Sequence, residues 1–151
     1  MSGVLDSGSE SSNDITVVAR GQGTVTVAVT NNTLFQYANA YGIFLCSAEG
    51  PSLLNATVMN NSVKDPGTFA LNGIRVDAGV TVGDSGTVCA HIVGNNVTGS
   101  GLFTDDIRLR QRFNTTIRLP GYAGANGDTS AVNAFVAANN DPPGAAPPPT
   151  V

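Results

Sequence analysis

The chain has 151 residues, of which 12% are charged and 18 are Gly, none is Trp, and the formal net charge is -4. This length suits one domain with a substantial core, and the abundance of Gly, Asn, Thr and Val is typical of strands and turns. The acidic balance and the single Lys64 argue against nucleic acid as a partner. No apolar run reaches the roughly 20 residues of a membrane helix.

Residues 1–13 are mostly Ser, Gly and acidic residues, and this composition predicts a disordered lead-in. The first strand signal follows it, and it recurs along the chain as "DITVVA" from residue 14, "GIFLCS" from 42, "GIRVDA" from 73 and "DIRLRQ" from 106. Each copy carries two aliphatic residues two positions apart, which is the period of a strand with one buried face.

A second phrase alternates with the first. It reads "VTNNTL" from residue 29, "VMNNSV" from 58 and "IVGNNV" from 92, with offsets of 29 and 34 residues between Asn32, Asn61 and Asn95. The residues before these Asn positions alternate apolar and polar in the same columns, so they predict a second strand type. A last strand, "TTIRLP" from residue 115, completes the series.

A period near 30 residues carried by short strands predicts a solenoid. We expect an all-β, single-stranded parallel β-helix of about four coils over residues 14–127, with two strands in each coil. In that arrangement Asn32, Asn61 and Asn95 occupy the same corner of successive coils. Their amides then form a hydrogen-bonded ladder, because a buried amide without a partner costs about 1–3 kcal/mol.

The period changes in "DTSAVNAFVAANN", residues 128–140. Asp128 or Thr129 can cap a short helix, and Val132, Phe135 and Val136 lie on one face of it. Because an isolated helix of this length is marginal in water, we expect it to lie across the open end of the coils as a cap. Residues 141–151 are Pro-rich and predict a disordered tail.

The C-terminal third resembles a known family. The stretches "TVCAHIVGNNVTGSG", "DDIRLRQRFNTTIRLPGYAG" and "AVNAFVAANN" are similar to the C-terminal end of bacterial β-strand-repeat proteins. The resemblance implies a right-handed parallel β-helix of the pectin-lyase-like superfold. It also implies an exported protein that is extracellular or at the cell surface, and it implies no reaction.

Candidate chemistry lies on the outward positions of the first strand type, where Asp77, Arg108 and Arg110 are predicted to project. Polysaccharide lyases of the pectin-lyase-like superfold place acidic calcium ligands and a basic residue on this face, so Asp77 with Asp105, Asp106 and Arg108 is one interpretation. A calcium site needs several converging oxygens, and only Asp77 clearly projects outward. We therefore interpret Asp77 and Arg110 as a surface ion pair on adjacent coils, and we expect no metal and no cofactor.

These observations favour a non-enzymatic role: a structural or adhesive β-helical segment that forms the capped C-terminal end of a stalk in an exported bacterial surface protein. The alternative is a carbohydrate-binding or polysaccharide-lyase-like module that uses the outward face of the first strand type. Surface glycans or other coils of the same protein are the expected partners. Because residues 1–13 are mostly polar and no apolar element before Ile15 is predicted to cover the first coil, we expect either end-to-end self-association of the chain or masking of this coil by residues 1–13.

Overall fold

A computed structural model describes residues 13–37, 40–98 and 106–140 of the chain. Asn13 begins the first strand, and the rest of the predicted lead-in lies outside the described residues. The predicted tail, residues 141–151, also lies outside them. Among the described residues, no helix is long and apolar enough to cross a membrane.

The described residues form strands followed by one helix, and all strand pairs are parallel. The elements are β1 (Asn13–Arg20), β2 (Thr24–Thr30), β3 (Thr33–Phe35), β4 (Tyr41–Ala48), β5 (Leu53–Met59), β6 (Ser62–Lys64), β7 (Asn72–Ala78), β8 (Thr87–Val93), β9 (Asn96–Val97), β10 (Ile107–Gln111), β11 (Thr116–Arg118) and α1 (Thr129–Ala138).

Three sheets arise because equivalent strands of successive coils pair with one another. The front sheet has the order β1-β4-β7-β10, the back sheet β11-β8-β5-β2 and the side sheet β3-β6-β9. The first coil is therefore β1–β3, the second β4–β6 and the third β7–β9, while β10 and β11 form a partial fourth coil. The predicted parallel solenoid is confirmed.

Two details of the prediction need correction. The described chain completes three coils and adds a partial one, where about four were expected. Each complete coil also contains a third strand, because the residues after each ladder Asn pair with one another. Leu34 lies in register with Val63, and Val63 with Val97. A side strand of two or three residues is too short for a period-2 pattern to indicate.

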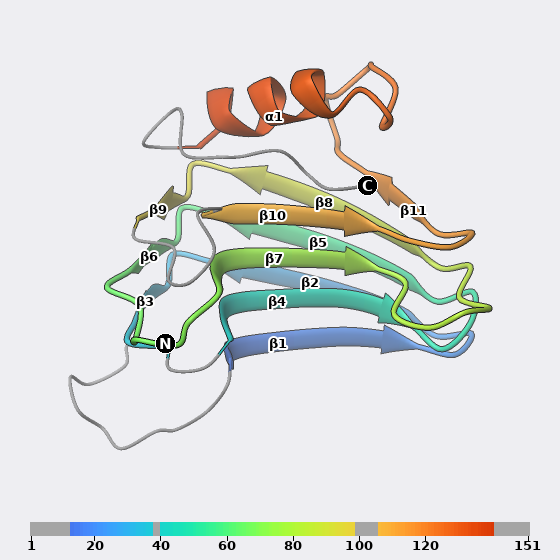
Figure 1. The fold of residues 1–151 in the computed structure, drawn as a ribbon, viewed down its shortest axis with the longest axis horizontal. Coiled ribbons are helices and arrows are strands. Elements are labelled where there is room, and N and C mark those ends of the chain that lie inside the picture. The colour runs from blue at the N-terminus through green and yellow to red at the C-terminus, as the bar shows by residue number, and fades with distance from the viewer. Residues whose placement is uncertain (1–12, 38–39, 99–105, 141–151) are drawn as a thin grey trace.

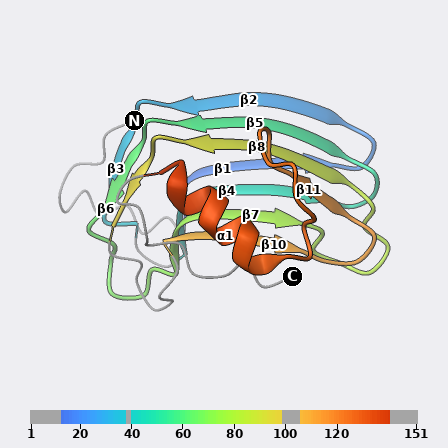
Figure 2. The ribbon, with the colours of Figure 1, turned by 90° about the horizontal axis from the view of Figure 1, so that it is seen from above.

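The chain climbs steadily from β1 to α1. Figure 1 shows the front sheet running one way before the back sheet, which runs the other way, with α1 across the last coil. Seen from above in Figure 2, the path turns counter-clockwise as it rises toward the viewer, so the winding is right-handed.

Inward side chains form apolar columns through the stack. One column in the back sheet joins Val25, Leu54 and Val88, and Ile117 continues it in the partial coil. The burial of alternate residues in β5 and β8 follows from one face lying on the core and the other on the surface. The strand signals in the sequence had this origin.

The columns are not equally covered along their length. Ile43, Leu45, Ile74 and Val76 in the second and third coils are fully buried. Their counterparts in the first coil, Ile15 and Val17, are only partly buried, and so are Val25 and Val27. The first coil is thus the less protected end of the core.

The last coil is covered by α1. The helix begins after Asp128, whose side chain accepts a hydrogen bond from the Ala131 amide at 3.0 Å and so satisfies one of the free donors of the first turn. Val132 and Val136 are buried in the core cluster. Phe135 is partly buried and packs against Tyr122, with 5.3 Å between ring centroids.

Candidate functional site

The outward side of the front sheet holds the residues that the sequence singled out for chemistry. Arg110 on β10 lies in register with Asp77 on β7, and Arg108 lies in register with Arg75. Cys46 on β4 is the neighbour of Asp77 on the opposite side. The parallel pairing therefore brings Asp77, Arg108 and Arg110 onto two adjacent strands.

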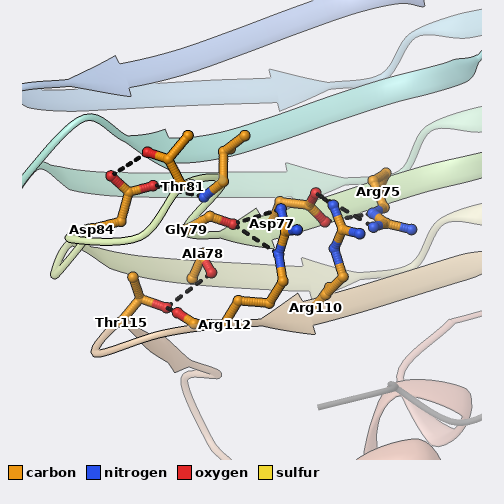
Figure 3. A network of polar contacts seen from close by, with 10 residues as sticks. Arg75, Asp77, Ala78, Gly79, Thr81, Asp84, Arg110, Arg112 and Thr115 are labelled. Carbon is orange, nitrogen blue, oxygen red and sulfur yellow. Dashed lines mark hydrogen bonds and ion pairs between the residues drawn. The ribbon is translucent and has the colours of Figure 1, made fainter.

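Asp77 is the centre of a compact charged cluster (Figure 3). The Arg75 Nε donates to Asp77 Oδ1, and Arg75 Nη2 lies 3.3 Å from Asp77 Oδ2. From the next strand, Arg110 Nη2 donates to the same Oδ2 at 2.5 Å. Both carboxylate oxygens are thus engaged by guanidinium groups.

The predicted pairing of Asp77 with Arg110 is present, but its description as a surface pair is wrong. Asp77 and Arg75 are each only 3% exposed, whereas the Arg110 side chain is 31% exposed. Arg75, two positions before Asp77 on the same strand, points to the same side of the sheet and helps to cover the carboxylate. The sequence analysis gave Arg75 no role, although its position in the outward column was a signal for one.

Aromatic rings extend this cluster along the sheet. The Arg75 guanidinium lies 5.6 Å from the centroid of the Tyr41 ring, which stacks on Phe44 at 5.2 Å. A cation over an aromatic face is stabilised by the ring quadrupole. The buried charge of Arg75 therefore has two sources of compensation, the carboxylate and the ring.

The turn after β10 is anchored onto β7. Arg112 donates to the Gly79 carbonyl from Nε at 3.2 Å and from Nη2 at 3.0 Å. Thr115 Oγ1 donates to the Ala78 carbonyl at 2.8 Å. These bonds satisfy main-chain acceptors at the end of β7, so Arg112 and Thr115 serve the turn (Figure 3).

Asp84 organises the loop between β7 and β8. Its Oδ2 accepts from the amides of Val80 at 2.6 Å and Thr81 at 2.9 Å, and its Oδ1 accepts from the Gly50 amide at 3.3 Å. These amide donors hold the pKa of Asp84 below its ordinary value, despite the opposing effect of desolvation. This carboxylate ties the loop of the third coil to the second coil.

A small open cavity of about 220 Å³ lies between this loop and the outward side of β1 and β4. Phe44 and Cys46 line it from β4, and Val80 and Thr81 line it from the loop. Burial raises the pKa of the Cys46 thiol to about 11, with the Asp77 carboxylate acting in the same direction. The thiol is therefore protonated at neutral pH, when it is a poor nucleophile.

Asp77 and Asp106, the described acidic residues of the proposed calcium site, do not converge. Asp106 is buried, and it lies four residues before Arg110, the residue in register with Asp77. Four residues span about 13 Å along a strand, so Asp106 is far from the Asp77 carboxylate. Asp105 lies outside the described residues. Within the described ranges, no group of three or more His, Cys, Asp or Glu side chains could hold a metal ion.

The Asn ladder is the most regular polar feature of the described chain. Asn32 Nδ2 donates to Asn61 Oδ1 at 2.9 Å, and Asn61 Nδ2 donates to Asn95 Oδ1 at 2.8 Å. Each acceptor oxygen also receives the backbone amide of the preceding Asn, at 3.0 and 3.1 Å. The predicted ladder is confirmed, and it holds together the corner between the back and side sheets.

The residue before each ladder position explains why the sequence spells Asn twice. Asn31 and Asn60 have φ of 57° and 55°, and Gly94 takes the equivalent place with φ of 68°. Asn tolerates this left-handed conformation better than most residues, and Gly adopts it freely. A Cβ on Gly94 would also lie 2.5 Å from Asn60 Oδ1, so a larger residue here would have to displace the Asn60 side chain.

A fourth rung, Asn140, was missed by the sequence analysis. Its Oδ1 accepts from Asn95 Nδ2 at 2.9 Å and from the Asn95 amide at 3.1 Å. The signal was available, because residues 139–140 repeat the Asn-Asn pair. In the sequence this pair lies at the end of the predicted helix, and nothing in a one-dimensional pattern places a helix end above a coil corner.

Comparisons of this chain with family models, with curated proteins and with solved structures find no match.

Proposed function

We propose that the protein is a non-enzymatic structural or adhesive β-helical segment, and that its capped C-terminal end closes the stalk of an exported bacterial surface protein. The observation that carries this proposal is the contrast between the two ends of the stack. The ladder and the apolar columns end under α1 and Asn140, whereas Ile15, Val17, Val25 and Val27 are only partly buried. A stalk needs a stable terminus of this kind at one end.

The use made of polar side chains supports the same proposal. Asp77 binds two guanidinium groups, Asp84 binds backbone amides, and each ladder Asn binds the next coil. A catalytic carboxylate needs at least one oxygen free to meet its substrate or a transferred proton. In Asp77 both oxygens are engaged, Oδ1 by Arg75 of the same strand and Oδ2 by Arg110 of the next coil.

A tandem duplication of residues 41–71 tests whether the stack can be extended. This segment is the second coil and the link to β7, so the copy should stack between the second and third coils. The stability of a solenoid is approximately the sum of the stabilities of its coils and of the interfaces between neighbouring coils, so the added coil should raise the urea midpoint of unfolding. The stack should also lengthen by about 4.8 Å. A Gly/Ser insert of equal length at the same place is the control. A duplicated chain that unfolds more easily than this control would contradict the stalk.

Antibody labelling of intact cells tests the proposed location. The chain should be labelled before lysis and should be removed by protease added outside the cells. Labelling that requires lysis would contradict export while leaving the extendable stack intact.

Acidic polysaccharide binding is a second candidate function, favoured by the charge of the front sheet. Arg75 and Arg110 project from β7 and β10 and share the single carboxylate of Asp77. Within this cluster of described residues the cations outnumber the carboxylate, although the whole chain has a net charge of -4.

Titration with polygalacturonate, with and without calcium, separates the two candidates. Binding that weakens in Arg110→Gln and in high salt would favour the second candidate, since the Arg110 side chain is more exposed than that of Arg75. Release of an unsaturated sugar product would indicate that the chain is a lyase as well as a polysaccharide-binding module. Arg118→Gln, a change on an exposed arginine of the back sheet, is the matched control. If the unsubstituted chain does not bind polygalacturonate, the structural role is the better account.

A further inference from the structure

The upper edge of the back sheet is only partly covered by a strand. β11 pairs with Thr87, Val88 and Cys89, the first three residues of β8. Beyond that point the end of α1 takes over, since the Gly94 amide donates to the Asn139 carbonyl at 2.6 Å and Asn140 Nδ2 donates to the Ile92 carbonyl at 3.2 Å. The helix end therefore occupies the place of the next coil's corner.

The bonds made by Asn140 repeat those made by the ladder. Asn61 Nδ2 donates to the Val29 carbonyl, Asn95 Nδ2 to Val58 and Asn140 Nδ2 to Ile92, which are equivalent residues of β2, β5 and β8. The second donor of Asn140 is also engaged, because Asn140 Nδ2 lies 2.8 Å from the Val136 carbonyl of its own helix. The ladder thus ends without presenting a donor to a further coil.

The helix also covers the upper ends of the apolar columns. Leu109 and Ile117, the inward residues of the partial coil, share one buried cluster with Val132 and Val136. Figures 1 and 2 show α1 lying across the top of the stack. Displacement of α1 would therefore bare the upper ends of the apolar columns. At the edge of β11, the Ile117 amide and carbonyl are bonded to Gln111 Oε1 and Asn126 Nδ2, two side chains that a stacking strand would have to replace.

The first coil of a second copy has the pattern that fits this surface. In the chain itself Ile15, Ile43, Ile74 and Ile107 form one column, and Val17, Leu45, Val76 and Leu109 form the next. A second β1 placed on β10 would add another Ile and Val to these columns. A second β2 placed on β11 would likewise add Val25 above Ile117.

We infer that α1 and Asn140 act as a stop against self-assembly, and that they occupy the surface on which the first coil of a second copy of this chain would stack. A head-to-tail contact repeats without closing and so produces filaments. With α1 in place, the upper end of each copy cannot receive a further coil. This inference concerns the chain itself and does not depend on the proposed stalk function.

The test displaces the helix while keeping the full chain. Val132→Lys/Val136→Lys should detach α1, and sedimentation should then show a several-fold rise in mean mass that increases with protein concentration. Electron microscopy should show unbranched filaments one solenoid wide. Addition of the unsubstituted chain should shorten them, because it can dock by its first coil but cannot be extended.

Val17→Lys, added to the displaced-helix variant, identifies the surface. This change places a charge in the partly buried column of the first coil, and it should abolish the filaments while far-UV circular dichroism retains the strand signal. Filaments that persist with Val17→Lys would overturn the inference, and so would a folded displaced-helix variant that stays monomeric. If that variant does not fold, the milder Val132→Ser/Val136→Ser decides by the same measurements: filaments sensitive to Val17→Lys support the stop, and a folded monomer with α1 detached refutes it.

Discussion

The two ends of the solenoid differ in how well the apolar core is covered. At the upper end, α1 buries Val132 and Val136 over the last coil, and Asn140 takes the place of a ladder residue. At the lower end, Ile15, Val17, Val25 and Val27 are only partly buried. The comparison teaches that a repeated coil is fully buried and hydrogen-bonded only in the middle of a stack, where a neighbour on each side supplies the contacts. A coil at either end needs a different element to cover it.

The largest expected effect comes from breaking the ladder at its centre. Asn61→Ala should lower the free energy of unfolding by about 4 kcal/mol, because it leaves the Asn32 amide, the Val29 carbonyl and Asn95 Oδ1 without this partner. Asn32→Ala, at the lower end, should cost only about 1 kcal/mol. Urea denaturation measures both values.

Asn55→Ala is the control for the ladder, because Asn55 projects from the outer side of β5 and is partly exposed. It should change the free energy of unfolding by less than about 0.5 kcal/mol. Equal costs at Asn61 and Asn55 would mean that the ladder contributes little to stability.

A smaller effect is expected from one core column. Val88→Ala in the third coil should cost about 2 kcal/mol, because Val88 is fully buried and its loss leaves a cavity. The same change at Val25, in the same column of the first coil, should cost less than about 1 kcal/mol. Thermal unfolding of both variants measures the difference, and equal losses would show that the first coil is as well protected as the third.

The cap formed by α1 and Asn140 should also contribute to the free energy of unfolding. Asn140→Ala should cost about 1–2 kcal/mol, because the Asn95 amide and the Ile92 carbonyl lose their partners at the upper end. Amide hydrogen exchange at Asn95 should become faster. Asn133→Ala, a partly exposed position of the same helix, is the control and should leave the exchange at Asn95 unchanged.

The smallest effect is the dependence of stability on pH. The pKa of Asp84 is lowered from 3.8 in the folded chain, so the Asp84 carboxylate contributes to the free energy of unfolding above pH 3.8. This contribution is lost as the pH falls through the pKa of Asp84 in the folded chain. The pKa of Asp14, in the first coil, is raised from 3.8 by burial, so its charged form opposes folding at neutral pH. Urea midpoints should therefore lose part of their acid dependence in Asp84→Asn and rise slightly at pH 7 in Asp14→Asn. The opposite signs would contradict these assignments.

Several features could be predicted because they are local or repeated. The alternation of Val25, Val27 and Val29 is a property of consecutive residues, and its return near residues 54 and 88 requires stacked coils. The ladder could be predicted for the same reason, since Asn32, Asn61 and Asn95 stand at one place in each cycle. The partners of Asp77 could be predicted only in part. The register of the strands identified Arg110, whereas the burial of the carboxylate by Arg75 depends on the side-chain conformation of Arg75, which the sequence pattern does not specify.

By itself, the sequence determined the parallel solenoid, its strand columns and the corner at which amides stack, because a fixed period puts equivalent residues above one another. Only the tertiary structure decided where the stack stops. Asn140 belongs to a helix in the sequence and to the ladder in space, and the chain must fold back over its last coil before these two roles coincide. The physical reason is that repetition specifies contacts between like elements, whereas an end is a contact between unlike ones.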